Sequence, residues 1–341
     1  MKILVTGGAG YIGSHTVLAL LQAGHTVVAL DNFCNSSAMS LKQVARISNR
    51  SALLIVGDVR DQALLDRLFA EHVIDAVLHF AGLKAVAESV SKPIEYYENN
   101  VDGSLTLVKA MAKAGVWRLI FSSSATVYGE SSQMPIREDF PTGEITNPYG
   151  RSKLMVEELL QDLANADAQW SIAILRYFNP VSAHESGMIG EDPEGTPTNL
   201  LPNISRVASG AMKRLLIYGD DYPTHDGTCV RDYIHVMDLA DGHLKALENI
   251  SDQCGVNIWN LGTGTGYTVL EMVRAFERAS GKTVPLEIVA RRVGDIAECW
   301  ADTSKAAKEL NWTADRKLDV MMQDLWRWQS NNPNGYKASD G

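Results

Sequence analysis

The 341-residue sequence is poor in cysteine, and its few cysteines are not arranged as pairs or ligand sets. Cys34, Cys229, Cys254 and Cys299 lie far apart, with no C-x-x-C spacing and no histidine pair nearby. A disulfide framework or a structural zinc site would require such spacing. We therefore expect no bound metal and a reducing compartment, which makes a cytoplasmic protein the expectation.

The sequence also lacks long hydrophobic runs. No stretch approaches the roughly 18 apolar residues that a membrane-spanning helix requires. The first apolar run ends at Thr6 in a glycine-rich segment, unlike the core of a signal peptide. We expect no membrane partner.

Positive charge is scarce. The chain has 31 Lys and Arg against 41 Asp and Glu, a net charge of −10. Proteins that bind the phosphate backbone need a cationic surface, so nucleic acid is not an expected partner. A small anionic ligand is compatible with this balance where a few arginines gather. The length is sufficient for two lobes, each with a core of its own.

A glycine cluster follows the first predicted strand, at residues 3–5, and precedes a helical pattern at residues 11–21. Gly7, Gly10 and Gly13 have the spacing that lets a tight turn approach a pyrophosphate, which the helix N-terminus then holds. The second strand, at residues 25–30, ends at Asp31. A carboxylate there accepts hydrogen bonds from an adenosine ribose and repels a 2′-phosphate, which favours NAD over NADP.

Short apolar strands alternate with helices through the first half of the chain. They are predicted at residues 3–5, 25–30, 53–58, 76–80, 118–121 and 171–175. This alternation predicts an α/β fold with a Rossmann-type, doubly wound parallel sheet, whose ligands bind at the carboxyl ends of the strands.

The regular alternation ends at residue 181. Residues 181–200 form a predicted irregular loop, and later helices and strands, including a strand at 257–261, are assigned to a smaller mixed α/β lobe. We predict an NAD-binding domain at residues 1–180 and a substrate lobe at 181–341, between which the chain can cross. A second glycine cluster, at residues 262–266, is interpreted as an ordinary loop because no matching acid follows it.

Tyr149 and Lys153 are four residues apart in a predicted helix, so they share one face. A free tyrosine has a pKa near 10 and is a poor base at neutral pH, but a nearby ammonium lowers that pKa. Ser124, at the end of the fifth strand, can bond the same substrate hydroxyl. These three residues are the predicted catalytic group, acting by general acid and base catalysis.

Several segments together resemble the extended short-chain dehydrogenase/reductase family, and within it the branch that epimerises UDP-glucose and UDP-galactose at C4. The resemblance covers nearly the whole chain. It rests on Thr6-Gly-Gly-Ala-Gly-Tyr-Ile-Gly13, His79-Phe-Ala-Gly82, Ser122-Ser-Ser-Ala-Thr-Val-Tyr-Gly129, Tyr149-x-x-x-Lys153, Arg176-Tyr-Phe-Asn-Pro180, Gly190-Glu-Asp-Pro193, Arg231-Asp-Tyr-Ile-His-Val236 and Arg291-Arg-x-Gly-Asp295.

The resemblance implies the residues of two binding sites. NAD would be held by Gly7, Gly10, Tyr11, Ile12, Gly13, Asp31, Asn32, Cys34, Asn35, Ser36, Asp58, Val59, Phe80, Ala81, Gly82, Lys84, Asn99, Ser124, Tyr149, Lys153 and Phe178. The UDP-sugar would be held by Ser124, Tyr149, Asn179, Asn199, Leu200, Leu216, Ile217, Tyr218, Arg231, Arg292, Asp295 and Cys299. It further implies a homodimer.

The implied activity is reversible C4 epimerisation through a 4-keto sugar, with NAD bound tightly. Position 299 departs from part of the family, because Cys299 stands where some bacterial relatives have tyrosine. The smaller side chain leaves room for a 2-acetamido group, so UDP-GlcNAc and UDP-GalNAc are expected substrates as well. A buried structural cysteine is the alternative interpretation.

Two other functions share the fold and the cofactor. A nucleotide-sugar 4,6-dehydratase needs an acidic pair after the strand-end hydroxyl, whereas Ala125 and Thr126 follow Ser124 here. A protein that only senses NAD would have no use for the combination of Tyr149, Lys153 and Ser124. Both are less favoured than the epimerase.

Overall fold

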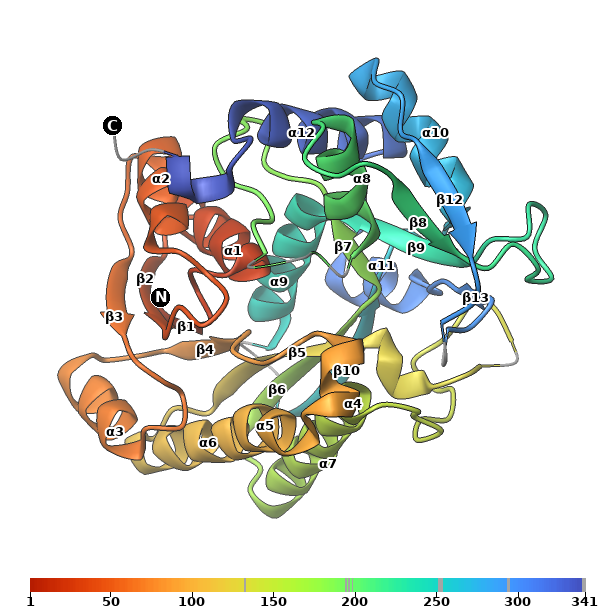
Figure 1. Cartoon of the computed structure of the whole chain (residues 1–341). Coiled ribbons are helices and arrows are strands. Elements are labelled where there is room, and N and C mark those ends of the chain that lie inside the picture. Colours follow the sequence, from red (N-terminus) through yellow and green to blue (C-terminus); the bar gives the residue numbers. More distant parts are fainter. Residues whose placement is uncertain are drawn as a thin grey trace.

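The structure, a computed structural model, describes residues 1–131, 133–193, 195, 197, 199–250, 254–292 and 295–338. Its centre is a seven-stranded parallel sheet in the order β10-β6-β5-β4-β1-β2-β3 (Figure 1). The strands are β1 (Lys2–Thr6), β2 (Thr26–Asp31), β3 (Leu53–Val56), β4 (Ala76–His79), β5 (Arg118–Ser124), β6 (Ser171–Tyr177) and β10 (Gly255–Leu261). This topology confirms the predicted Rossmann-type α/β class.

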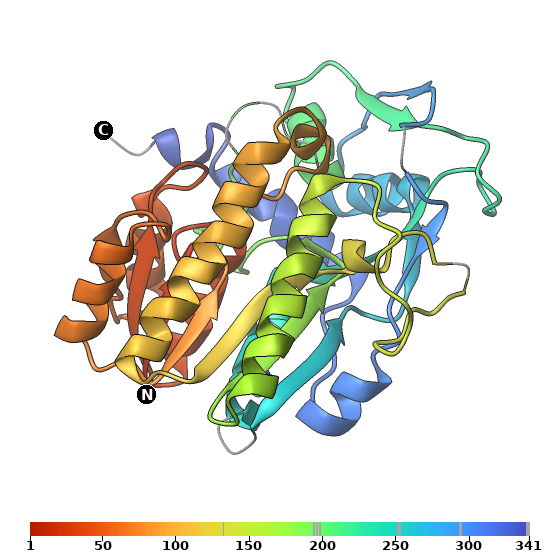
Figure 2. The same cartoon turned by 90° about the horizontal axis from the view of Figure 1, so that it is seen from below.

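Helices cover both faces of the sheet, which is why most positions of its inner strands are buried and apolar (Figures 1 and 2). Along β1, Ile3 and Val5 belong to the core on one face and Leu4 to the core on the other. One face carries α1 (Tyr11–Gln22), α2 (Ala38–Ser48) and α9 (Val236–Ile250). The other carries α3 (Gln62–Glu71), α4 (Val86–Ser91), α5 (Pro93–Tyr97), the π-helical turn η1 (Glu98–Asp102), α6 (Gly103–Ala114) and α7 (Pro148–Ala166).

The predicted strand at 257–261 lies in a different place from the one expected. As β10 it pairs in parallel with β6, at the edge of the large sheet, and not within the smaller lobe. The preceding helix, α9, also packs on this sheet, against α1. The register partners of β10 in β6 are 84 residues earlier in the sequence (Gly255 pairs with Ser171), so a local sequence pattern could not assign β10 to either sheet. The chain therefore crosses back into the large lobe after residue 235.

The second lobe is built from short strands and three helices. β9 pairs with β7, β11 and β13, while β12 and β8 form a separate pair. The strands are β7 (Asn179–Val181), β8 (Leu215–Tyr218), β9 (Val230–His235), β11 (Gly266–Thr268), β12 (Leu286–Val289) and β13 (Glu298–Cys299). The helices are α8 (Leu200–Ala208), α10 (Val269–Ser280) and α12 (Leu318–Asn331). The remaining elements are α11 (Ser304–Leu310), η2 (Ala125–Tyr128) and η3 (Gly335–Ala338).

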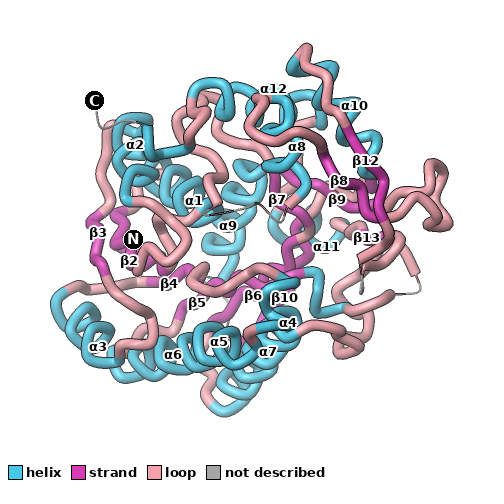
Figure 3. Tube along the Cα trace, in the orientation of Figure 1, coloured by secondary structure: helices cyan, strands magenta, loops and turns pink. Residues whose placement is uncertain are grey.

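The connection from β7 to α8 is drawn as loop in Figure 3. Its described residues form no helix or strand beyond a single bridge between Ala183 and Gly190, as expected for an irregular segment. Part of this loop (194, 196 and 198) and part of the predicted motif at 291–295 (293 and 294) lie outside the described residues. Within the described ranges, no helix has the length and hydropathy that a bilayer crossing requires.

Candidate active site

The glycine turn after β1 is so tight that side chains would not fit. Gly7 has a φ of +67°, and a Cβ there would lie 2.8 Å from Ala81 N. A Cβ on Gly13 would lie 2.1 Å from Gly7 O, while one on Gly10 would lie at 3.2 Å. Gly10 is also the N-cap of α1, so no side chain at the cap covers the amides of the first turn. The turn therefore forms the cradle that a pyrophosphate requires.

Asp31 connects this turn to the loop after β2. Its Oδ2 accepts from Ala9 N (2.9 Å), and its Oδ1 accepts from Phe33 N (2.9 Å) and Ser36 Oγ (2.7 Å). The carboxylate thus fixes the predicted adenosine side of the site, where Cys34 and Asn35 lie in the same loop. Asn32 donates to Asp58 Oδ2 (3.0 Å), which joins this loop to the end of β3.

The Asp58 carboxylate is held in place by Arg60. The two side chains form paired hydrogen bonds of 2.9 Å and 2.8 Å, which hold the pKa of Asp58 well below its usual range. The carboxylate is consequently ionised and acts only as an acceptor. The next residue, Val59, is buried and packs into the core under the site.

The segment after β4 lies between the glycine turn and α7, the helix that contains the predicted Tyr149 and Lys153. It contains Phe80, Ala81 and Gly82, and a Cβ on Gly82 would lie 3.6 Å from Lys153 Nζ. Asn100 was not predicted from the sequence. Its Oδ1 accepts from Leu83 N (2.8 Å), and its Nδ2 donates to Leu83 O (3.0 Å) and to Ser152 Oγ (2.9 Å). Asn100 lies beside the predicted Asn99 in η1, a break in helical register that periodicity does not detect.

Glu191 is a second residue that the sequence analysis did not assign. Its side chain is 8% exposed, and its Oε1 accepts from Lys84 Nζ (2.9 Å) and Asn199 Nδ2 (3.1 Å). Lys84 is a predicted cofactor residue and Asn199 a predicted substrate residue. The Lys84 ammonium also lies 5.9 Å from the ring centroid of Tyr11. Glu191, which is far from Lys84 in sequence and eight residues from Asn199, thus connects the two predicted sites.

The predicted catalytic residues meet at the carboxyl end of β5. Ser124 ends β5, and Tyr149 lies in the first turn of α7, where its phenol hydrogen-bonds Ser124. Lys153 is buried one turn later, and its Nζ donates to Ser122 O (2.7 Å). The structure therefore brings all three together, from one strand and one helix.

The pKa values differ from the expectation. Burial raises the pKa of Tyr149, and its hydrogen bond with Ser124 only partly opposes this. Lys153 does not produce the predicted lowering of the Tyr149 pKa, because the Lys153 ammonium donates to Ser122 O. Burial lowers the pKa of Lys153 to about 8, and Glu157 opposes that shift. A further positive charge at the site would favour the Tyr149 phenolate.

The predicted UDP-sugar residues lie on the second lobe and at the ends of β6 and α8. Phe178 is buried next to Asn179, which begins β7, and Leu200 begins α8. Ile217 is buried in β8, whereas Leu216 is 41% exposed. The Arg292 guanidinium lies 3.8 Å from the Tyr218 ring centroid, and Asp295 N donates to Arg292 O (3.3 Å). Among the residues described, no hydrogen bond or ion pair joins this group to Tyr149.

Cys299 does lie near the catalytic residues. It is buried in a cluster with Ala125 and Phe178, the residues that follow Ser124 and precede Asn179. It is also the register partner of Arg231, through the β13–β9 pair. Burial raises the pKa of the Cys299 thiol to about 11, so the side chain is a neutral thiol at physiological pH.

The second glycine cluster is occupied from within the chain. Asp232 is buried, and its carboxylate accepts from Thr263 N (2.8 Å), Thr263 Oγ1 (2.7 Å), Gly264 N (3.0 Å) and Ala301 N (3.2 Å). An internal carboxylate thus fills the position that a phosphate takes in a nucleotide-binding turn. This supports the interpretation as an ordinary loop.

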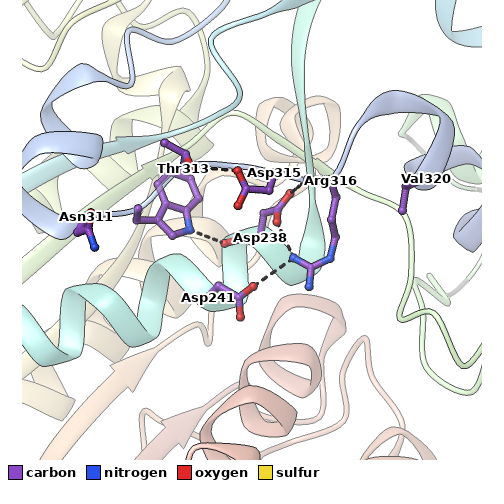
Figure 4. Close-up of a pocket in the computed structure, with 8 residues that line it drawn as sticks. Asp238, Asp241, Asn311, Thr313, Asp315, Arg316 and Val320 are labelled. Atoms are coloured by element: carbon purple, nitrogen blue, oxygen red, sulfur yellow. Dashed lines mark hydrogen bonds and ion pairs between the residues drawn. The ribbon is translucent and has the colours of Figure 1, made fainter.

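A cavity of about 540 Å³ lies elsewhere, beside α9 (Figure 4). Asp238 and Asp241 both bond the Arg316 guanidinium there, at 2.5 Å and 3.1 Å. None of the eight lining residues is a predicted site residue. Across the described chain, no group of three His, Cys, Asp or Glu side chains is placed to hold a metal ion.

The sheet order, the glycine turn at β1 and the Tyr149–Lys153 pair against Ser124 define a dinucleotide-binding enzyme of the extended short-chain dehydrogenase/reductase type. The chain belongs to the NAD dependent epimerase/dehydratase family, whose model matches residues 3–262.

Comparisons with individual proteins agree with this family. The chain is 60% identical to a UDP-glucose 4-epimerase of Haemophilus influenzae, over 99% of this chain and 100% of that protein. It is 57% identical to a UDP-glucose 4-epimerase of Bacillus subtilis, over the full length of both. A crystal structure of UDP-glucose 4-epimerase from Bifidobacterium longum in complex with NAD+ and UDP is 55% identical, with a TM-score of 0.96 over 98% of this chain and 100% of that one.

Proposed function

We propose that the protein interconverts UDP-glucose and UDP-galactose by reversible epimerisation at C4, using a tightly bound NAD. The observation that carries this is the meeting of Tyr149, Ser124 and Lys153 at the end of β5, joined to the glycine turn through Gly82 and Ala81. The names of the relatives support the choice of substrate. The glycine turn supplies the cradle for a pyrophosphate and Asp31 the carboxylate for a ribose, the two features that NAD requires.

In this function Tyr149 and Ser124 move the proton of the sugar 4-hydroxyl. NAD, when bound, would supply the acceptor for the hydride of the sugar C4 and the source of that hydride in the second half of the reaction. Tyr149 accepts the proton, which leaves a 4-keto sugar, and returns it after the sugar has turned in its pocket. Lys153 supplies positive charge and holds the nicotinamide ribose, with Asn99 and Phe178 lining that side. Because both the hydride and the proton return to the sugar, the reaction has no net redox change.

Two arginines are the proposed anchor of the UDP. A diphosphate needs forked cationic donors, and Arg231 and Arg292 supply them in a protein with a net charge of −10. Each is positioned by its surroundings: Arg231 Nη1 donates to Val230 O (2.8 Å), and Arg292 stacks on Tyr218. Holding the diphosphate lets the hexose turn over without leaving the site.

The two lobes divide these tasks in our proposal. Residues 1–180 bind NAD and residues 181–341 bind the UDP-sugar, with α9 and β10 crossing back to the large sheet. Cys299, a small buried side chain in the cluster beside Ser124, leaves room for a 2-acetamido group. UDP-GlcNAc and UDP-GalNAc are therefore proposed as further substrates.

We also propose a homodimer, formed by the helices of the large lobe. Val90 and Ile94, in α4 and α5, are 63% and 71% exposed, and Met155 of the adjoining α7 is 43% exposed. These helices contact one another, and exposed apolar side chains on adjoining helices are compatible with an interface. All four cysteines are free thiols, two of them exposed, which supports a location in the reducing cytoplasm.

Incubation of the purified protein with UDP-galactose, without added NAD, tests the function. We expect UDP-glucose to form, and UDP-GlcNAc to form from UDP-GalNAc in a parallel reaction. Absence of epimer even after NAD is added would overturn the activity. Epimer formation only after NAD is added would overturn the tight retention of the cofactor.

A further inference from the structure

Three residues at successive turns of α7 face the end of β5. Tyr149, Lys153 and Glu157 are spaced by four, so they lie on one side of the helix. Each meets one of the three consecutive serines of β5. Tyr149 bonds Ser124, Lys153 Nζ donates to Ser122 O (2.7 Å), and Ser123 Oγ donates to Glu157 Oε1. The first two contacts belong to the catalytic group described above, whereas the third has no assigned role.

Glu157 is buried at 0% exposure and is tied to a second strand by an ion pair. Arg176 Nη2 lies 2.6 Å from Glu157 Oε2, and Arg176 Nε donates to Oε1 at 3.1 Å. Ser123 of β5 and Arg176 of β6 are register partners, so both side chains leave the sheet on the α7 face. The Glu157 carboxylate thereby joins one helix to two adjacent strands.

The other side of the Arg176 guanidinium is also fixed. It lies 4.7 Å from the Tyr128 ring centroid, and its Nη1 donates to Glu138 O (3.4 Å). The Tyr128 hydroxyl in turn donates to Asn260 Oδ1 (2.6 Å) on β10. A buried ion pair with this many fixed partners specifies one geometry, because movement of α7 would leave a charge unpaired in the interior.

We propose that Glu157 is a positioning residue for the epimerisation, which with Ser123 and Arg176 holds α7 so that Tyr149 and Lys153 meet the end of β5. The proposal rests on the function proposed above. Hydrogen bonds in the catalytic group depend on α7 keeping its distance and rotation relative to β5. Sequence spacing alone does not set either quantity.

The same carboxylate acts on Lys153 through space. Titratable groups face Lys153 from two elements: Glu157 and Tyr149 on its own helix, and His79 on β4. On β6, Tyr177 faces Tyr149. Of these, Glu157 favours the charged form of Lys153, whereas burial disfavours it. Loss of the Glu157 charge would therefore let Lys153 lose its proton at a lower pH.

The test compares Glu157→Gln, which keeps the size of the side chain, with Glu158→Gln, the same change at an exposed neighbour. We expect Glu157→Gln to lower kcat for UDP-galactose by about a hundredfold, the usual effect of a misplaced catalytic group, with a much smaller change in KM and NAD still bound. The alkaline limb of its kcat–pH profile should move to lower pH. Glu158→Gln should match the wild type in each measurement.

A second variant separates positioning from folding. Glu157→Gln combined with Arg176→Met removes both charges, so no unpaired charge is buried and the fold is restored. We expect kcat to stay low in this folded double variant. Recovery of kcat to the wild-type value, or an unchanged kcat and pH profile in Glu157→Gln, would overturn the proposal. An inactive wild type would instead overturn the function on which it rests.

Discussion

The hydroxyl of Ser124 has its acceptor sites filled by its own loop. Thr126 N (3.2 Å) and Thr126 Oγ1 (3.0 Å) both donate to Ser124 Oγ. A serine hydroxyl has one donor and two acceptor positions, so its O–H is left to donate to Tyr149. A bond donated to the phenol oxygen favours the phenolate, which agrees with the direction in which Ser124 moves the pKa of Tyr149.

At the scale of the single residue, we expect Tyr149→Phe to abolish turnover but to retain bound NAD. Removal of the hydroxyl removes the proposed base, and general base catalysis contributes roughly a thousandfold in rate. The glycine turn is unchanged, so the purified variant should carry NAD in the same ratio as the wild type. Two quantities are measured: kcat with UDP-galactose and the NAD content of the purified variant. A fully active variant would contradict the assignment of Tyr149 as the base.

Cys299→Tyr should narrow the substrate range. Cys299 is buried beside Ala125 and Phe178, so a tyrosine must extend into the space beside the catalytic serine. We expect loss of UDP-GalNAc epimerisation, by roughly tenfold or more, with UDP-galactose largely unaffected, because steric rejection of one group costs about 1–3 kcal/mol. Equal activity of the variant on both substrates would show that Cys299 is only a buried structural residue.

At the scale of the element, the two glycine clusters have similar sequences and different surroundings. The first, at the start of α1, has glycines whose absent side chains open the turn to a ligand. The second is filled by the Asp232 carboxylate, which accepts from Thr263 and Gly264 amides. The tertiary structure places Asp232 there from β9, about 30 residues earlier in the chain.

Gly13→Ala tests the first turn as an element. Its Cβ would lie 2.1 Å from Gly7 O, so the turn must shift. We expect a loss of about 1–3 kcal/mol in the free energy of unfolding and purification without NAD. Gly242→Ala in α9 is the control, since its Cβ would meet only side-chain atoms, the nearest being Leu261 Cδ1 at 3.0 Å, and lies outside the turn. Equal NAD content in both variants would contradict the role of the turn as a tight cradle.

At the scale of the whole molecule, burial lowers the pKa of three fully packed histidines most strongly. The pKa values fall from 6.5 to about 3 for His15, about 3 for His79 and about 4 for His243. His79 illustrates the cause: it is 3% exposed between Thr6 Oγ1 (2.7 Å) and Ser104 Oγ (2.9 Å), which are neutral partners. Among the described residues, no carboxylate acts on these three rings to stabilise an imidazolium.

These histidines predict a loss of stability in mild acid. Below pH 6.5 the unfolded chain binds protons that the folded chain excludes, so the free energy of unfolding falls as pH falls. The slope is about 1.4 kcal/mol per pH unit for each such histidine between pH 6.5 and about 4. The free energy of unfolding, measured with denaturant at pH 7 and at pH 5, gives this slope. His79→Gln should reduce the slope, whereas His225→Gln, at a side chain 64% exposed, should not.

The proposed dimer makes a separate prediction at this scale. Ile94→Glu places a charge in the exposed apolar face of α4 and α5 and should yield monomers in sedimentation experiments, because an unpaired charge cannot be buried cheaply. Val73→Glu, at a valine 82% exposed elsewhere on the surface, is the control and should leave the dimer intact. A wild type that sediments as a monomer would refute the proposed dimer.

Much of the first lobe could be predicted because its signals are local. Strand–turn–helix order, the glycine spacing and the Tyr149–Lys153 interval all lie within short windows, and the structure has them as expected. The second lobe could not be predicted as well, since β7, β11 and β13 have two or three residues each and exist only through pairing with β9. Strands this short have no periodicity to detect.

The sequence by itself determined the fold class and the dinucleotide turn and indicated the proposed catalytic group, because each depends on residue type at a fixed local spacing. Only the tertiary structure decided what acts on those residues. It placed β10 beside β6, Asp232 in the second glycine turn, and Glu191 between Lys84 and Asn199. It also buried Tyr149. Burial raises the pKa of this tyrosine, whereas a neighbouring positive charge alone would lower it. Desolvation and long-range contacts depend on the whole packed chain, and no short window of sequence contains them.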